Sequence, residues 1–119
     1  MPAARGLGTR VELRSPDCAT NPYLAIAVCL AAGLDGIKNN LQPVESIQRD
    51  IYSMTDEERD EAGIENLPKN LYEAIQEMRK SDFVKGVLGK EVFKKYIKAK
   101  EEEWMEYTSQ VTDGKLTGI

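Results

Sequence analysis

The chain has 119 residues, of which 41% are hydrophobic and 30% are charged. This length and composition suit one ordinary folded domain with a core of its own. Sixteen basic and 20 acidic residues leave a net charge of −4, which argues against nucleic acid as a partner. No apolar run approaches the roughly 20 residues that a membrane span requires, so we expect no membrane partner. Histidine is absent, which excludes Ser-His-Asp and Cys-His catalysis and any histidine metal ligand within this chain.

The cysteines and the arginines add two indications. Cys18 and Cys29 are the two cysteines and do not form a CxxC motif, so the sequence is typical of a reduced, cytoplasmic protein. Four of the five basic residues up to Arg49 are arginines, whereas lysines predominate afterwards. Because the planar guanidinium suits phosphate and carboxylate recognition, we expect any chemistry to lie early in the chain.

The first predicted element is a β-strand over residues 9–14, preceded by a loop at residues 1–8. Apolar and charged residues alternate strictly there, as in a strand with one buried face. No second convincing strand follows, so this strand needs a partner from outside the chain. We expect residues 9–13 to be disordered or paired with a second copy.

About five helices are predicted after the strand, so the fold class is mainly α. Thr20 or Asn21 caps a helix with Pro22 in its first turn. This helix is apolar on all sides and is therefore expected to be buried. An extended connector follows over residues 41–53. Four further helices are then expected at about residues 55–63, 70–80, 81–89 and 90–110, with a frayed end from residue 114.

Arg10, Glu12 and Arg14 are the residues most suited to chemistry. A period of two puts both guanidiniums and the carboxylate on one face of the predicted strand. The carboxylate could bind Mg²⁺ or Mn²⁺ while the arginines hold phosphoryl oxygens. A solvated strand face is the simpler interpretation and is favoured by spacing alone. One carboxylate cannot build a metal site, so further ligands must come from elsewhere.

Two other features are open to a functional interpretation. Tyr52 lies in an exposed connector and is a conceivable modification site, although a simple anchoring role is favoured. Trp104, together with Phe93 and Tyr96, forms an aromatic stripe on the last helix, for which packing is favoured over ligand binding.

Several ordered blocks resemble the carboxy-terminal part of bacterial type I glutamine synthetases. The resemblance covers essentially residues 2–111, and the set of blocks is far more specific than the Arg-x-Glu-x-Arg motif alone. The blocks are residues 9–17 (TRVELRSPD), 21–25 (NPYLA), 31–39 (AAGLDGIKN), 49–52 (RDIY), 88–89 (LG), 96–100 (YIKAK) and 103–104 (EW).

This resemblance implies a ligase that makes glutamine from glutamate, ammonia and ATP through γ-glutamyl phosphate, with Mg²⁺ or Mn²⁺ as cofactor. By position, Glu12 matches a cation ligand, Arg10 matches a contact to the nucleotide phosphates, and Arg14 matches a catalytic contact to glutamate and the transferred phosphoryl group. Tyr52 matches a tyrosine that some members adenylylate. However, residues 63–68 (GIENLP) resemble a feedback-regulated branch that is generally not modified there.

The resemblance also implies that residues 1–119 are one segment of a larger α+β catalytic domain, found in the family as a cytoplasmic homo-dodecamer. The expected partners are the remainder of the synthetase and its neighbouring subunits. We expect this segment to be inactive alone and to bind neither the cation nor ATP firmly. The alternative is a non-catalytic helical interaction module, a truncated paralogue that binds synthetase subunits or a regulator.

Overall fold

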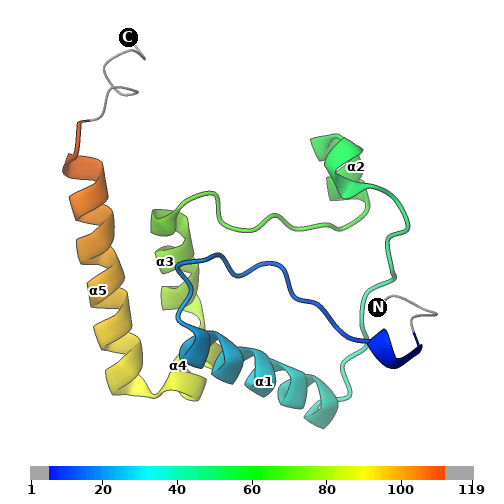
Figure 1. Ribbon diagram of the computed structural model, residues 1–119, viewed down its shortest axis with the longest axis horizontal. Coiled ribbons are helices and arrows are strands. Elements are labelled where there is room, and N and C mark those ends of the chain that lie inside the picture. Colours follow the sequence, from blue (N-terminus) through cyan, green and yellow to red (C-terminus); the bar gives the residue numbers. More distant parts are fainter. Residues whose placement is uncertain (1–5, 112–119) are drawn as a thin grey trace.

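The protein is described by a computed structural model covering residues 6–111, in which five α-helices are joined by extended connectors (Figure 1). The expectations for residues 1–5 and for the frayed end concern residues outside this described range. The elements in chain order are the 3₁₀ turn η1 (Gly6–Gly8), α1 (Pro22–Lys38), the 3₁₀ turn η2 (Ile51–Ser53), α2 (Asp56–Glu61), α3 (Leu71–Lys80), α4 (Asp82–Leu88) and α5 (Lys90–Ser109).

The helices α3, α4 and α5 form the packed part of the molecule. Figure 1 shows α5 beside α3, with α4 linking them at one end and α1 extending away from α4. The buried core there consists of Ile75 on α3 and Phe93 and Ile97 on α5. Partly buried side chains surround these three, namely Leu71, Met78, Val84, Leu88 and Trp104. The aromatic stripe of α5 is thus mainly a packing surface, as predicted.

Local capping explains where these helices begin. Asn70 accepts a hydrogen bond from the Glu73 N–H at 2.9 Å, and Ser81 accepts one from the Val84 N–H at 3.2 Å. Gly89 ends α4 and begins α5 with a φ of +78°, a conformation that favours glycine. The predicted boundaries of α3, α4 and α5 are confirmed to within one residue.

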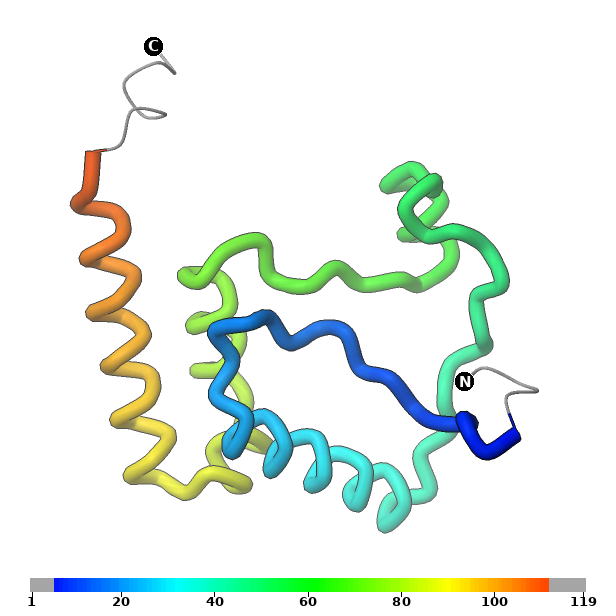
Figure 2. Tube along the Cα trace, viewed as in Figure 1, coloured from blue at the N-terminus to red at the C-terminus, as the bar shows by residue number. Residues whose placement is uncertain are grey.

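The predicted strand over residues 9–14 is wrong. The described residues, 6–111, contain no β-strand, and residues 9–17 form an irregular extended segment after η1. Figure 2 shows this segment running between α1 and the connector that leads from α2 to α3. Alternating side chains describe an extended backbone, but a strand also requires a neighbour for its N–H and C=O groups.

The prediction that α1 is a buried helix is also wrong for this chain. None of its residues is buried, and five of its large apolar residues are between 57% and 85% exposed (Tyr23, Ile26, Leu30, Leu34 and Ile37). Cys29 is exposed on the same helix. Among the described helices, α1 packs mainly against the short α4, which covers little of its surface. An all-round apolar composition therefore leaves a large apolar surface without cover here.

The connector and α2 lie apart from the α3–α5 core in Figure 1. Met54 is buried in this part of the chain, with 6% of its surface exposed. Thr55 and Glu58 form the predicted capping box of α2. No described helix is long and apolar enough to cross a membrane.

Candidate functional site

The candidate site is the extended segment that carries Arg10, Glu12 and Arg14, hereafter the Arg–Glu–Arg triad. The segment starts from η1, where the Thr9 N–H donates to the Gly6 carbonyl at 3.1 Å. Arg10 then folds back, and its Nη1 donates to the Gly8 carbonyl at 3.0 Å. These short-range hydrogen bonds shape the segment without a sheet.

Glu12 brings the triad together. One carboxylate oxygen, Oε1, pairs with Nη2 of Arg10, and the other, Oε2, accepts a hydrogen bond from Nη2 of Arg14 at 2.9 Å. The side chains of Arg10, Glu12 and Arg14 are 49%, 34% and 87% exposed, respectively. Both guanidiniums and the carboxylate are therefore clustered, as the spacing predicted, and all three are open to solvent.

The triad offers a metal ion one hard oxygen donor, the carboxylate of Glu12. Within residues 6–111, no group of three or more Cys, Asp or Glu side chains is placed to hold a metal ion. The triad therefore offers one carboxylate that a metal ion could use and two guanidiniums that suit anionic oxygens. A complete cation site would need additional donors.

Tyr52 lies outside the triad's network of ion pairs, on η2. The Asp50 carboxylate caps this turn by accepting the Tyr52 N–H at 3.1 Å. The side chain is 96% exposed, which agrees with the expectation of an exposed connector. The structure therefore leaves the phenol accessible, and the triad and Tyr52 are separate features.

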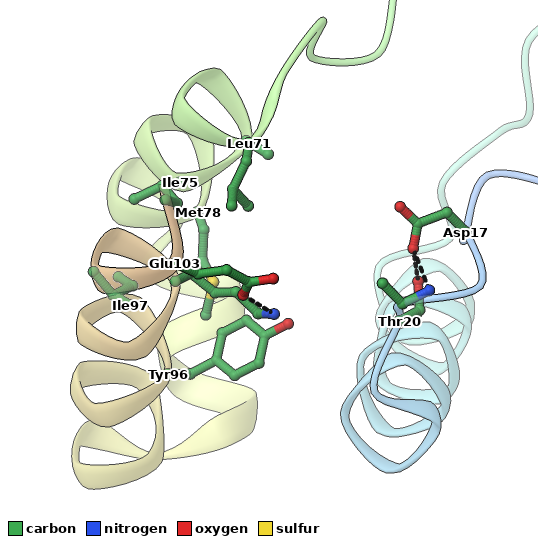
Figure 3. Close-up of a pocket in the computed structure, with 11 residues that line it drawn as sticks. Asp17, Thr20, Leu71, Ile75, Met78, Tyr96, Ile97 and Glu103 are labelled. Carbon is green, nitrogen blue, oxygen red and sulfur yellow. Dashed lines mark hydrogen bonds and ion pairs between the residues drawn. The ribbon is translucent and has the colours of Figure 1, made fainter. Parts of the chain in front are cut away.

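A cleft of about 340 Å³ is a feature that the sequence reasoning missed (Figure 3). It lies between the turn that contains Asp17 and Thr20, on one side, and α3 with α5, on the other. Ile75, Met78, Tyr96 and Ile97 are among the residues that supply its apolar wall. The available signal was the apolar spacing of α3 and α5, but the opposing turn comes from a distant part of the sequence.

Lys100 supplies the cationic group of this cleft. Its Nζ donates to the Glu103 carboxylate at 2.6 Å and lies 5.6 Å from the ring centroid of Tyr96. The hydrogen bond to Glu103 raises the pKa of Lys100, and desolvation opposes it; Asp17 adds a smaller charge effect in the raising direction. Lys100 therefore stays charged at neutral pH and faces the turn that follows the triad.

A second charged contact ties the connector to α2. Nη2 of Arg49 lies 3.1 Å from Oε1 of Glu58, and Oε2 of Glu58 accepts the Thr55 N–H at 2.8 Å. The backbone hydrogen bond from Thr55, followed by the contact with Arg49, lowers the pKa of Glu58. Both contacts stabilise the ionised carboxylate, which fits a structural role at the start of α2.

Comparison with known proteins identifies relatives along almost the whole chain. The family model described as the glutamine synthetase catalytic domain matches residues 1–118. Glutamine synthetases from Clostridium saccharobutylicum and Methanosarcina mazei are each 53% identical, over 116 and 117 residues. The glutamine synthetase of Thermotoga maritima is 47% identical over 116 residues. Each alignment covers 98% of this chain but 26% of the relative, so the chain spans about a quarter of the length of these proteins.

Proposed function

This chain belongs to the glutamine synthetase catalytic-domain family, and we propose that it forms the carboxy-terminal part of an ATP-dependent glutamate–ammonia ligase. The reaction makes glutamine from glutamate, ammonia and ATP through γ-glutamyl phosphate. The observation that carries the proposal is the Arg–Glu–Arg triad, which clusters one carboxylate and two guanidiniums in a family member. These are the groups that phosphoryl transfer to a carboxylate requires for charge neutralisation and positioning.

Each triad residue has a proposed role. Glu12 supplies one oxygen ligand to Mg²⁺ or Mn²⁺, and the bound cation neutralises negative charge on the phosphates. Arg10 binds the nucleotide phosphates. Arg14 orients the glutamate substrate and stabilises the phosphoryl group during its transfer. Tyr52, whose phenol is exposed, is proposed to correspond to the tyrosine that some family members adenylylate.

The exposed surface of α1 supports the proposal that this segment works only as part of a larger assembly. Five large apolar side chains of that helix lie in solvent in this chain, and such a surface normally marks an interface. We propose that the remaining catalytic domain covers α1 and supplies the other cation ligands. Assembly into a cytoplasmic homo-dodecamer with neighbouring subunits follows from the same proposal.

The alternative of a separate helical interaction module is not favoured. The family match extends over residues 1–118 and includes the triad, not only the helical part.

The described residues include no complete cation site. We therefore expect the 119-residue chain alone to catalyse nothing.

A domain exchange tests the proposal. The quarter of the Clostridium saccharobutylicum enzyme that matches this chain is replaced by residues 1–119, and γ-glutamyl transfer is measured with Mn²⁺. We expect the chimera to be active, its Glu12→Ala variant to lose most turnover, and its Glu45→Ala variant to keep it, because Glu45 is an exposed connector residue. The chain alone should match the background of its own Glu12→Ala control. An assembled but inactive chimera, or turnover by the chain alone, would contradict the proposal.

A further inference from the structure

Both arginines of the triad form ion pairs with the carboxylate of Glu12 in this chain. Oε1 of Glu12 pairs with Arg10 and Oε2 pairs with Arg14, so each carboxylate oxygen engages a different guanidinium. One negative charge thus offsets much of the positive field of two cations.

Phosphate and carboxylate oxygens use the same N–H donors of a guanidinium. Glu12 engages Nη2 of each arginine, so a phosphate that takes the Nη2 donors of Arg10 or Arg14 has to displace Glu12 from that contact. The exposure of all three side chains allows this exchange to occur without opening the fold. Arg10 has a further anchor in the Gly8 carbonyl, which keeps it near the site when Glu12 leaves.

We propose that Glu12 is an internal competitor for phosphate, which holds Arg10 and Arg14 until a polyphosphate replaces it. Displacement by phosphate then frees both oxygens of Glu12 as hard donors. Phosphate binding to the arginines and ligation by Glu12 are thereby coupled, and each favours the other. This inference rests on the proposed function, because it takes a polyphosphate as the natural ligand of the two arginines.

The exposure of the triad sets the size of the effect. Ion pairs between exposed groups contribute little individually, and two of them together correspond to about a three- to tenfold change in affinity. Removing the charge of Glu12 should therefore strengthen metal-free phosphate binding by about this factor. A carboxylate that only decorated the surface would give the much smaller change expected from net charge alone.

Inorganic tripolyphosphate is the probe, titrated into the 119-residue chain by calorimetry at low ionic strength with EDTA present. Glu12→Gln removes one negative charge from the triad, and Glu45→Gln removes one from the exposed connector. We expect about three- to tenfold tighter binding for Glu12→Gln and less than about a twofold change for Glu45→Gln. In about 1 M salt, where the Debye length is about 3 Å, the difference should disappear.

The variant with both Arg10→Gln and Arg14→Gln distinguishes the competitor role of Glu12 from the phosphate-binding role of the two arginines. If that variant loses tripolyphosphate binding while Glu12→Gln equals Glu45→Gln, the competitor role is refuted and the phosphate role stands. If the double variant binds as well as the original chain, the phosphate role of the arginines fails, and the proposed function loses its main support. Far-UV circular dichroism provides the folding control, since all these substitutions lie outside the α-helices.

Discussion

Truncation of Ile97 to alanine tests whether the small core between α3 and α5 holds this part of the chain together. Ile97 is 7% exposed and packs in one cluster with Ile75 and Phe93. The substitution removes three carbon atoms, each worth about 0.8 kcal/mol when buried, and leaves a cavity that adds to the loss. Alanine recovers about 0.5 kcal/mol through its higher helix propensity. We therefore expect the free energy of unfolding to fall by about 2–3 kcal/mol.

Urea unfolding followed by far-UV circular dichroism measures this change. The matched control is Val92→Ala on the same helix, because Val92 is 45% exposed and gains a similar helix propensity on substitution. We expect that control to lower stability by less than about 1 kcal/mol. Equal losses for the two variants would refute the assignment of the core to this face of α5.

Three further outcomes follow from the site and from α2. In the active chimera, Arg14→Ala should lower kcat/KM by an amount equivalent to about 2–4 kcal/mol, which is typical of losing one preorganised hydrogen-bond donor to the transition state. A kcat/KM within threefold of the parent chimera would contradict this expectation. The folded-state pKa of Glu58 lies below its ordinary value of 4.5. The ionised Glu58 carboxylate therefore stabilises α2 fully above pH 4.5, and this stabilisation is lost as the pH falls through the lowered pKa. A pH titration of the NMR chemical shifts of residues 56–61 would report the loss. Thr55→Ala should weaken the same helix by about 1 kcal/mol at neutral pH, and unchanged shifts would show that the capping box is dispensable.

The helix boundaries were predictable because their causes are local. Thr55, Asn70 and Ser81 each cap a helix through a hydrogen bond to an N–H three residues later. Gly89 separates α4 from α5 through its own backbone conformation. Neither device depends on what the rest of the molecule does, so a short stretch of sequence is sufficient to place it.

The strand and the burial of α1 failed because both depend on distant surfaces. Alternation in residues 9–14 predicts an extended backbone, which is found, but strand pairing needs a neighbour that the described residues do not provide. The apolar residues of α1 indicate that another surface covers this helix, but that surface is not supplied by the described residues of this chain. The cleft beside Lys100 was missed for a related reason, since only the tertiary fold places Asp17 across the cleft from α5.

The three charged side chains of the triad do lie together, but for a different reason from the one expected. Spacing placed Arg10, Glu12 and Arg14 on one face of a pleated strand, whereas in the structure ion pairs to Glu12 gather them without a sheet. The alternating charges of Arg10, Glu12 and Arg14 therefore predicted the proximity of these side chains better than the expected strand did. The functional roles remain predictions, because family resemblance alone connects these residues to substrates.

The narrow sequence range of the core has a consequence for the order of folding. Its buried members lie between Ile75 and Ile97, on helices joined through the short α4. Closing so short a loop carries a small entropic penalty, and contacts that are local in sequence form quickly, typically in microseconds to milliseconds for helical units. We expect α3, α4 and α5 to assemble as an early folding nucleus, onto which α1 and the triad segment dock later. The triad segment would then take its final shape last, during the proposed assembly that covers α1.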